Sequence, residues 1–293
     1  MKLNNPVPDY TIILQHYSSR IFSDQGDVIS AMLGIMRRLS YRMDCTFFQG
    51  IPVATFDIFL LFHGSMLKRR KIFPSYSWAG WIGQITYHER TTIQSGATNF
   101  WLRRRTWIVW YERTPAGEVN LLSDLVEKEA LAELSEFQVD HDMSSSDGAR
   151  PLNTSTFQAE PVKGAQFERS VPDYAMLQFW TIAVFYRIDS FDVMEGIANL
   201  SDKSGKRCGT LRMDSFEEDD YFNLGSIYEF ILLARSYGDY CNQCQRHEGS
   251  LFYIMIIEWC GGFAERRGLG ELCHTAIETS LQPGPIWKHI FLA

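Results

Sequence analysis

Two cysteines and a histidine at the spacing of metal ligands are the first candidates for chemistry in this sequence. They lie in the segment 241–247, which has the sequence Cys-Asn-Gln-Cys-Gln-Arg-His. A closed structural zinc site needs four ligands, and no second Cys-x-x-Cys pair is present to complete one. The only other candidates are Cys260, Cys273 and His274, which lie in or beyond an expected central strand. We therefore predict loop cysteines without a metal.

Carboxylates and arginines in the last forty residues could instead act on an anionic substrate. Glu258, Glu265 and Arg266 combine the acid–base and anion-binding groups that a nucleotide or NAD hydrolase would use. A simpler explanation is a hairpin after a strand, in which Gly268 and Gly270 supply positive φ angles. We favour the hairpin and keep the hydrolase as the alternative hypothesis.

The usual signatures of enzymes are missing from the chain. There is no Gly-x-Ser-x-Gly elbow, no His-Glu-x-x-His helix and no Gly-Lys-Ser/Thr phosphate loop. Asp140, His141 and Asp142 look like part of an acid–base set, but they open a polar stretch in which nothing would hold their geometry. We therefore predict no catalytic residue, no metal and no cofactor.

Two basic clusters, 68–71 and 103–105, have aromatic neighbours, a combination that is typical of nucleic-acid sites. The chain as a whole is acidic, with 28 Lys and Arg against 35 Asp and Glu. Residues 1–115 hold 14 basic against 7 acidic side chains, and residues 116–293 hold 14 against 28. We therefore expect the clusters to form solvated turns or to pair with the acidic part, and we do not expect nucleic-acid binding.

The composition, 45% hydrophobic and 14% aromatic, predicts a large buried core. No run reaches the roughly 18 apolar residues of a membrane span, because the most apolar stretch, 175–186, contains Gln178. The opening segment 1–8 is short and polar, unlike a secretory signal, which predicts a cytoplasmic protein. Its six scattered cysteines are expected to be reduced thiols. We expect protein partners and no membrane, and the oligomeric state stays open.

Apolar residues at helical spacing predict helices over 10–18, over 25–40 after the N-cap Asp24, and after Pro52. An acidic helix is predicted over 124–137 and a last one over 270–281. Aromatic and β-branched runs predict the following strands: 78–87, 106–111, 177–188, 209–213, 227–235, 251–259 and 287–292. The strands 227–235 and 251–259 are nearly all apolar, so we expect them to be central.

These elements predict an α+β fold, with N-terminal helices packed on a mostly antiparallel β-sheet or sandwich. We expect residues 1–72 to form a helical region and residues 73–293 a β-rich domain packed with it. The stretch 138–172 is too polar to offset the entropy of ordering, so it is predicted to be a disordered insertion. The aromatic segment 73–81 could form a recognition surface, but a buried core motif is the better interpretation.

Three stretches of the chain resemble the region that follows the HET domain in fungal heterokaryon-incompatibility proteins. Residues 17–20 and 27–35 are similar to the family's Tyr-Ser-x-Arg and Asp-x-x-x-Ala-x-x-Gly helix. Residues 74–81, Pro-Ser-Tyr-Ser-Trp-Ala-Gly-Trp, resemble its Pro-Ser-Trp-Ser-Trp-Ala-Gly-Trp. Segments within 255–292 look like its usual ending. The residues that carry the resemblance are Tyr17, Arg20, Asp27, Pro74, Ser75, Trp78, Gly80, Trp81, Glu258, Glu265, Arg266, Gly268, Gly270 and Trp287.

The resemblance implies a role without catalysis. Neither the Trp-Ile-Asp-x-Leu-Cys-Ile-Asn-Gln nor the Arg-x-Trp-Thr-x-Gln-Glu motif of the HET domain occurs in these residues. The resemblance therefore implies a paralogue, a fragment or a truncated gene product without the domain to which death signalling is attributed. What it implies is a scaffold or recognition region that takes part in fungal non-self recognition and programmed cell death.

Overall fold

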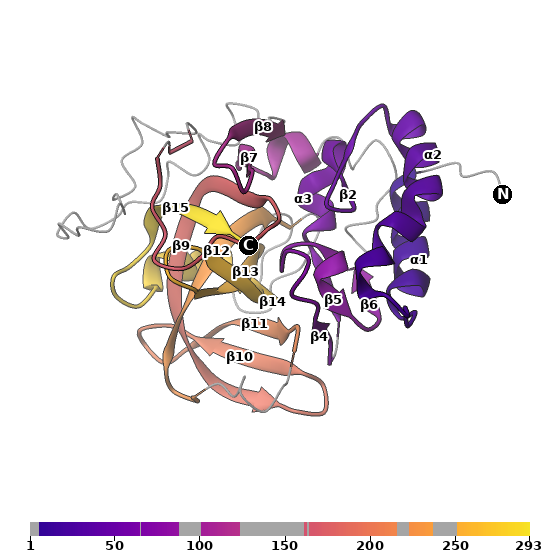
Figure 1. Ribbon diagram of the computed structural model, residues 1–293. Helices are drawn as coiled ribbons and strands as arrows, with labels where there is room; N and C mark the ends of the chain where they lie inside the picture. The colour runs from indigo at the N-terminus through magenta and orange to yellow at the C-terminus, as the bar shows by residue number, and fades with distance from the viewer. Residues whose placement is uncertain are drawn as a thin grey trace.

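The computed structural model describes residues 6–64, 66–87, 101–123, 161–162, 164–215, 223–236 and 251–293. Helices from the amino-terminal part gather on one side of the molecule, and a large antiparallel sheet occupies the other (Figure 1). The predicted α+β class, with N-terminal helices packed on a mostly antiparallel sheet, is confirmed. Within the described residues, no helix is both long enough and apolar enough to span a membrane.

The amino-terminal layer contains short helices. They are α1 (Pro6–Ser18), η1 (Gln25–Val28), η2 (Ser30–Met32), α2 (Leu33–Met43), η3 (Val53–Thr55) and α3 (Phe56–Phe59). Helix α1 confirms the prediction over 10–18 and buries one stripe of side chains at helical spacing. The helix predicted over 25–40 begins instead as two 3₁₀ turns, and between them the Ser30 hydroxyl donates to the Asp27 carbonyl at 2.9 Å. The predicted N-cap Asp24 is confirmed by its bond from the Gly26 N–H.

Short strands fill the rest of this layer. They are β1 (Phe47–Phe48), β2 (Ile51–Pro52), β3 (Phe62–Gly64), β4 (Lys68–Arg69), β5 (Trp81–Ile82) and β6 (Ile85–Tyr87), and the turn η4 (Trp78–Gly80) precedes β5. The strand predicted over 78–87 is therefore interrupted, since Ser77 caps the η4 turn by accepting from the Ala79 N–H at 3.0 Å. Strand β3 pairs antiparallel with β6, and β4 pairs with β5.

The large sheet is built from longer strands. They are β7 (Trp110–Arg113), β8 (Val119–Ser123), β9 (Met176–Asp192), β10 (Ile197–Ser201), β11 (Arg207–Met213), β12 (Ile227–Arg235), β13 (Leu251–Trp259), β14 (Ala264–Cys273) and β15 (Ile286–Leu292). Strands β12 and β13 have the predicted bounds and the predicted central position. The strand predicted over 106–111 starts only at Trp110, and before it Thr106 makes an isolated bridge with Ala234.

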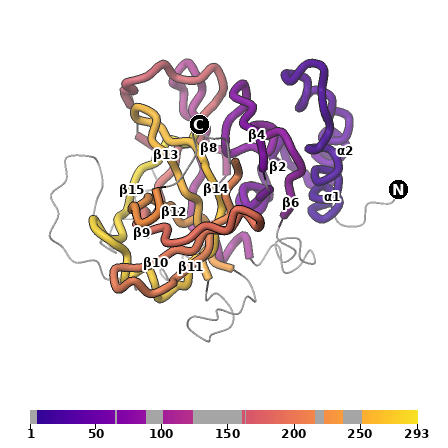
Figure 2. The backbone as a smooth tube through the Cα atoms, turned by 90° about the horizontal axis from the view of Figure 1, so that it is seen from below, coloured from indigo at the N-terminus to yellow at the C-terminus, as the bar shows by residue number. Residues whose placement is uncertain are grey.

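Six of these strands close into a ring. Strand β9 pairs with β10 and with β12, and the order β10–β11–β14–β13–β12 connects those two neighbours, all antiparallel. Strand β9 is long enough to pair with other strands as well. Its second half closes the ring, and its first half pairs with β7 and β15. Figure 2 shows these strands grouped apart from α1 and α2. The sheet is therefore a small barrel with an extension along β9, and β15 in that extension also makes one parallel pairing with β14.

The segment 264–273 overturns two predictions. Residues 265–270 are not a hairpin turn, because they lie inside β14 and the turn is formed by Gly261 and Gly262, whose φ angles are 68° and 105°. The helix predicted over 270–281 is a strand end followed by the 3₁₀ helix η7 (His274–Thr279). A Cβ on Gly270 would lie 2.2 Å from the Thr210 carbonyl oxygen. Glycine is therefore needed at these positions because it lets two barrel strands approach closely, and not because it can adopt a positive φ.

One hydrophobic core extends through both parts of the chain. It joins side chains of α1, α2 and α3 to those of β9, β12, β13 and β14 without a break. A smaller cluster contains Met176, Phe263 and Phe291, with Phe167 packed against it. The predicted acidic helix over 124–137 and residues 138–160 of the predicted insertion lie outside the described residues. Residues 164–172 contact the sheet, so the predicted disorder does not describe them.

Candidate functional site

The aromatic segment 73–81 lies in the core, as its composition predicts. Trp78 and Trp81 are 0% and 1% exposed. The indole Nε1 of Trp78 donates to the Gly50 carbonyl at 2.9 Å, and that of Trp81 donates to the Ser75 carbonyl at 2.8 Å. Large rings with satisfied N–H groups are typical of core positions. This segment therefore offers no recognition surface, and the interpretation as a core motif is confirmed.

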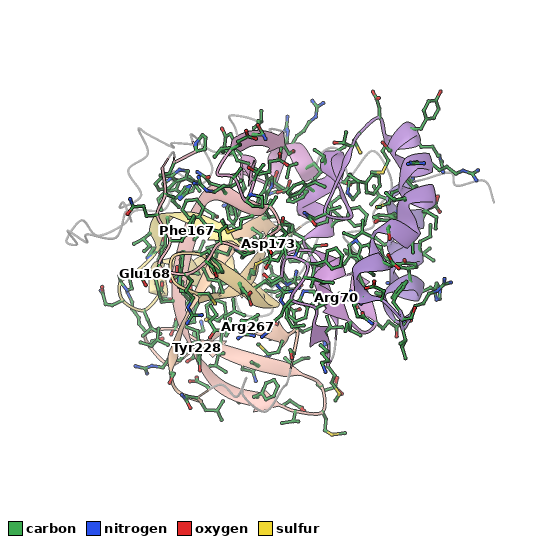
Figure 3. All side chains as sticks on the ribbon, viewed as in Figure 1. Arg70, Phe167, Glu168, Asp173, Tyr228 and Arg267 are labelled. Carbon is green, nitrogen blue, oxygen red and sulfur yellow. The ribbon has the colours of Figure 1, made fainter. Side chains whose placement is uncertain are left out.

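Two arginines of the basic cluster 68–71 hold this segment in place. The Nη1 atom of Arg70 donates to the carbonyls of Ala79 and Trp81 at 2.5 and 2.9 Å. Arg69 donates in the same way to the carbonyl of Gly80, at 3.0 Å. Figure 3 shows Arg70 where the amino-terminal layer meets the sheet. These two residues do not form a solvated turn, because the backbone carbonyls of a loop without regular pairing need donors. The other predicted outcome, pairing with the acidic part of the chain, is seen for Arg69, which lies 3.8 Å from Glu265.

Gly80 is required for the close approach of its backbone to that of Pro74. A Cβ on Gly80 would lie 2.1 Å from the Pro74 carbonyl oxygen, a distance that real Cβ atoms do not show. Tyr17 extends the cluster, since its ring meets that of Trp78 edge-on with centroids 5.9 Å apart. Its hydroxyl donates to the Val28 carbonyl at 2.8 Å. The first two stretches of the resemblance are thus brought together in one packed cluster.

Ser75 connects this loop to the other end of the chain. Its backbone N–H donates to the Ala293 carbonyl at 2.9 Å, and its hydroxyl donates to the same oxygen. The Ser75 hydroxyl in turn accepts from the backbone N–H of Arg266 at 2.9 Å. Ser75 and Ala293 are both 0% exposed. One serine therefore joins the segment 73–81, strand β14 and the end of β15.

Arg266 is the centre of a buried polar network that we name the arginine clamp: Arg266, Asp214 and the carbonyls of Leu60 and Phe62. Its Nε atom donates to Oδ2 of Asp214 at 2.7 Å, and Nη2 donates to Oδ1 at 3.0 Å. Its Nη1 atom donates to the Leu60 carbonyl at 2.7 Å, and Nη2 also donates to that of Phe62. The guanidinium carbon lies 3.7 Å from the Phe62 ring centroid. The clamp fastens β14 and the end of β11 to the chain around β3.

The remaining residues of the resemblance lie apart from the clamp. Arg20 and Asp27 are exposed, with Arg20 over the Tyr17 ring at 5.6 Å. Trp287 is 6% exposed and stacks on Trp180 with centroids 6.5 Å apart. Gly268 and Gly270 face the backbone of β11, as described above. None of these positions adds a reactive group to the clamp.

The three residues of the alternative hydrolase hypothesis do not converge. Glu258 and Glu265 are paired across β13 and β14, at the surface. Glu258 forms an ion pair with Arg267, and Glu265 lies 3.8 Å from Arg69. Arg266 is 0% exposed, and its N–H groups are already bound to protein acceptors. A substrate could not reach this arginine together with the two carboxylates.

Asp57 is a buried carboxyl that sequence analysis missed. It is 6% exposed and accepts from the indole Nε1 of Trp110 at 3.1 Å. Burial raises its pKa to about 7, and the hydrogen bond from Trp110 opposes that rise. A buried carboxyl with a raised pKa is common at functional sites, but it is also found in structural networks. No other titratable side chain is bonded to Asp57 in the described ranges, so its contacts indicate a structural role.

Metal binding finds no support in the part of the chain that the structure describes, where no three His, Cys, Asp or Glu side chains come together. Cys241, Cys244 and His247 lie outside the described residues, so the predicted absence of zinc at that segment stays a prediction. Cys208 is buried and free, and burial raises the pKa of its thiol to about 12. Such a thiol is protonated at neutral pH and unreactive, as buried structural cysteines are.

A cleft of about 230 Å³ lies between β3 and the outer wall of the barrel. Leu61 and His63 form one wall, and residues of β10, β11, β13 and β14 form the other. The imidazole Nδ1 of His63 lies 3.0 Å from the Thr86 hydroxyl, which fixes the ring. The arginine clamp binds the carbonyls of Leu60 and Phe62, so it positions the wall to which Leu61 and His63 belong. The cleft is therefore a pre-formed feature of the fold.

The strand register explains which side chains share the barrel wall of the cleft. Thr210 lies opposite Glu271, and Arg212 lies opposite Leu269. Residues directly opposite each other on neighbouring strands project from the same face of a sheet. Nothing in the sequence around Arg212 predicted this site, because the cleft forms only when β3 packs on the barrel. No sequence pattern identifies Asp214 as the partner of Arg266 either, since the two residues are 52 positions apart.

Comparison with known proteins adds no relative. No family model matches the chain, and neither a curated protein nor a solved structure matches it. The functional argument therefore depends on two features of the chain itself. One is the arginine clamp with the aromatic segment, and the other is the cleft that the clamp helps to form.

Proposed function

We propose that this chain is a non-catalytic scaffold or recognition region of the heterokaryon-incompatibility type, which acts with protein partners in the cytoplasm in non-self recognition and programmed cell death. The observation that supports it is the convergence of the residues that carry the resemblance. Ser75, Trp78, Gly80 and Trp81 belong to one buried loop, and Arg266 of the distant strand β14 joins that loop through the Ser75 hydroxyl. Residues with that placement hold a fold together and leave its outer surface for partners.

The alternative, a nucleotide or NAD hydrolase, has weaker support. Its three residues face different surroundings, with Arg266 in the core and both glutamates beside other arginines. General acid–base catalysis requires the acid and the anion-binding group within reach of one substrate. An assay of NAD and ATP cleavage by the purified chain tests this alternative directly. Cleavage that Glu258→Gln abolishes, in a folded protein, would replace the scaffold proposal.

The scaffold proposal is tested by a cell-death assay in a filamentous fungus. The chain is expressed alone and together with a HET-domain protein, and dying hyphal cells are counted with a dye that enters only permeable cells. We expect the chain alone to leave hyphae viable and its co-expression to change the fraction of dying cells. A folded, expressed chain that leaves this fraction unchanged would refute the proposal.

Two variants make the assay specific. Arg266→Ala opens the arginine clamp and should abolish the effect, because it removes four hydrogen bonds to buried acceptors. Arg267→Ala is the matched control, since the side chain of this neighbour in β14 forms a surface ion pair with Glu258 and is not part of the arginine clamp. It should retain the effect. The level of each chain in the cell is measured in parallel, so that a loss of protein is not mistaken for a loss of function.

A further inference from the structure

The cleft beside β3 contains two guanidinium groups that the fold itself does not use. Arg207 and Arg212 both line it and both are exposed. Within the described ranges, neither side chain forms an ion pair or a hydrogen bond to a protein acceptor. Arg69, Arg70 and Arg266, in contrast, are bound to carbonyls or carboxylates. The cleft arginines are therefore available to a ligand.

An irregularity in β11 places these two arginines on the same face. Leu200 of β10 pairs with Gly209 of β11, and the next residue of β10, Ser201, pairs with Arg207. Cys208 is therefore an extra residue in β11. Side chains alternate along a strand, and without this bulge Arg207 would face away from Arg212. Cys208 points inward and is 4% exposed. The bulge thus aligns Arg207, Thr210 and Arg212 along one wall.

The middle of this wall differs from its two ends. Thr210 lies between the arginines, at roughly 7 Å along the strand from each of them. Glu271 lies opposite Thr210, and Tyr253 lies opposite Glu271 on the next strand. A carboxylate accepts hydrogen bonds from hydroxyls and repels an anion. The wall therefore favours negative charge at both ends and hydroxyl groups in the centre.

We propose that the cleft binds a small sugar bisphosphate, with its two phosphates at Arg207 and Arg212 and its hydroxyls at Thr210 and Glu271. Arginine forks match phosphate oxygens with paired hydrogen bonds. Leu61 and Tyr253 supply apolar surface for the C–H groups of the sugar. A cleft of about 230 Å³ is below the volume of sites for drug-sized ligands, and it suits a small metabolite. This site goes beyond the scaffold function, which would stand without it.

Isothermal titration calorimetry on the full chain tests the site with four probes: fructose 1,6-bisphosphate, fructose 6-phosphate, fructose and inorganic phosphate. We expect one bisphosphate per chain, bound at least about tenfold more tightly than the monophosphate, because each charged contact contributes about 1.4 kcal/mol or more. Fructose should show no binding, and inorganic phosphate should bind more weakly than either ester. The absence of saturable binding of the bisphosphate at concentrations on the order of 10 mM would refute the proposal.

Single variants separate a built site from general attraction of anions. Arg207→Gln and Arg212→Gln should each remove the preference for the bisphosphate over the monophosphate. Both side chains are exposed, so the variants should fold, which their thermal unfolding checks. Lys206→Gln is the matched control, because this exposed neighbour of Arg207 does not line the cleft. An equal loss of affinity in all three variants, or no loss in the two arginine variants, would overturn the assignment. The cell-death assay does not depend on this result.

Discussion

Arg266 and Asp214 form a bidentate ion pair in the core, with both side chains 0% exposed. Two further N–H groups of Arg266 donate to the carbonyls of Leu60 and Phe62, so that each of its three nitrogens has an acceptor. A buried ion pair is tolerated only when its remaining hydrogen-bonding groups are satisfied, and this condition holds here. Arg266 therefore stabilises the junction between the amino-terminal layer and the barrel.

Removing one partner of this pair should cost more stability than replacing both. We expect Asp214→Leu and Arg266→Met each to lower the free energy of unfolding by about 3–5 kcal/mol, since each leaves an unpaired buried charge. The double variant should lose less than the sum of the two, because no charge remains buried. Urea unfolding of the four proteins gives this coupling energy. Additive losses would show that the pair is not coupled.

Asp57 should make the protein less stable as the pH rises. Burial raises its pKa from 3.8 to about 7 in the folded chain, so the folded state binds this proton more tightly than the unfolded state. The stabilising contribution is complete below pH 3.8 and is lost as the pH rises through about 7. Between pH 5 and pH 8 the loss should reach up to about 3 kcal/mol.

The variant Asp57→Asn tests this dependence, because an amide still accepts the bond from Trp110 but does not ionise. Its unfolding free energy, relative to that of the original chain, should increase between pH 5 and pH 8. Asp27→Asn, at an exposed position, is the control and should show no such trend. A constant difference between Asp57→Asn and the original chain at all pH values would contradict the prediction.

His289 should act in the opposite direction, at lower pH. Burial lowers the pKa of its imidazole from 6.5 to about 4, and the nearby Arg113 adds to that effect. The folded state therefore holds the neutral ring, against Trp180 and Phe291, and the unfolded state takes up the proton first. The contribution to stability is present above pH 6.5 and is lost as the pH falls through about 4, by up to about 3 kcal/mol. In His289→Gln, thermal unfolding between pH 7 and pH 4 should change less than in the original chain.

Gly270 should not accept a side chain. In Gly270→Ala the new Cβ would meet the Thr210 carbonyl oxygen at 2.2 Å, and both strands would have to move. We expect a loss of more than about 2 kcal/mol in urea unfolding. Gly34→Ala in α2 is the matched control, because a Cβ at this position would have nothing within 4 Å of it. Alanine there should raise the free energy of unfolding by about 0.5–1 kcal/mol. Similar effects of the two substitutions would rule out the close approach of β11 and β14.

Local patterns in the sequence predicted the strands that are apolar throughout. Strands β12 and β13 have the expected bounds, since runs of Ile, Leu and Phe satisfy both propensity and burial. Strand β14 was missed because Glu265, Arg266 and its glycines have low strand propensity. Its conformation comes from pairing with β11 and β13, which is tertiary information.

In the candidate site, too, local sequence patterns predict some positions and only tertiary contacts determine the others. Trp78 and Trp81 could be assigned to the core from their size alone. Arg266 could be singled out, but its role depends on Asp214 and on two carbonyls near position 60, and no local pattern connects these positions. The cleft needs the β11 bulge and the packing of β3, neither of which has a sequence signature.

The bond between Ser75 and Ala293 joins residues 218 positions apart. Contacts of such long range form late, because the entropy of closing so large a loop has to be overcome first. During synthesis the carbonyls and rings around Ser75 must therefore wait until residues near position 293 have left the ribosome. Over that interval the nascent amino-terminal layer exposes its apolar side, which makes it a substrate for chaperones and the stage at which aggregation would compete with folding.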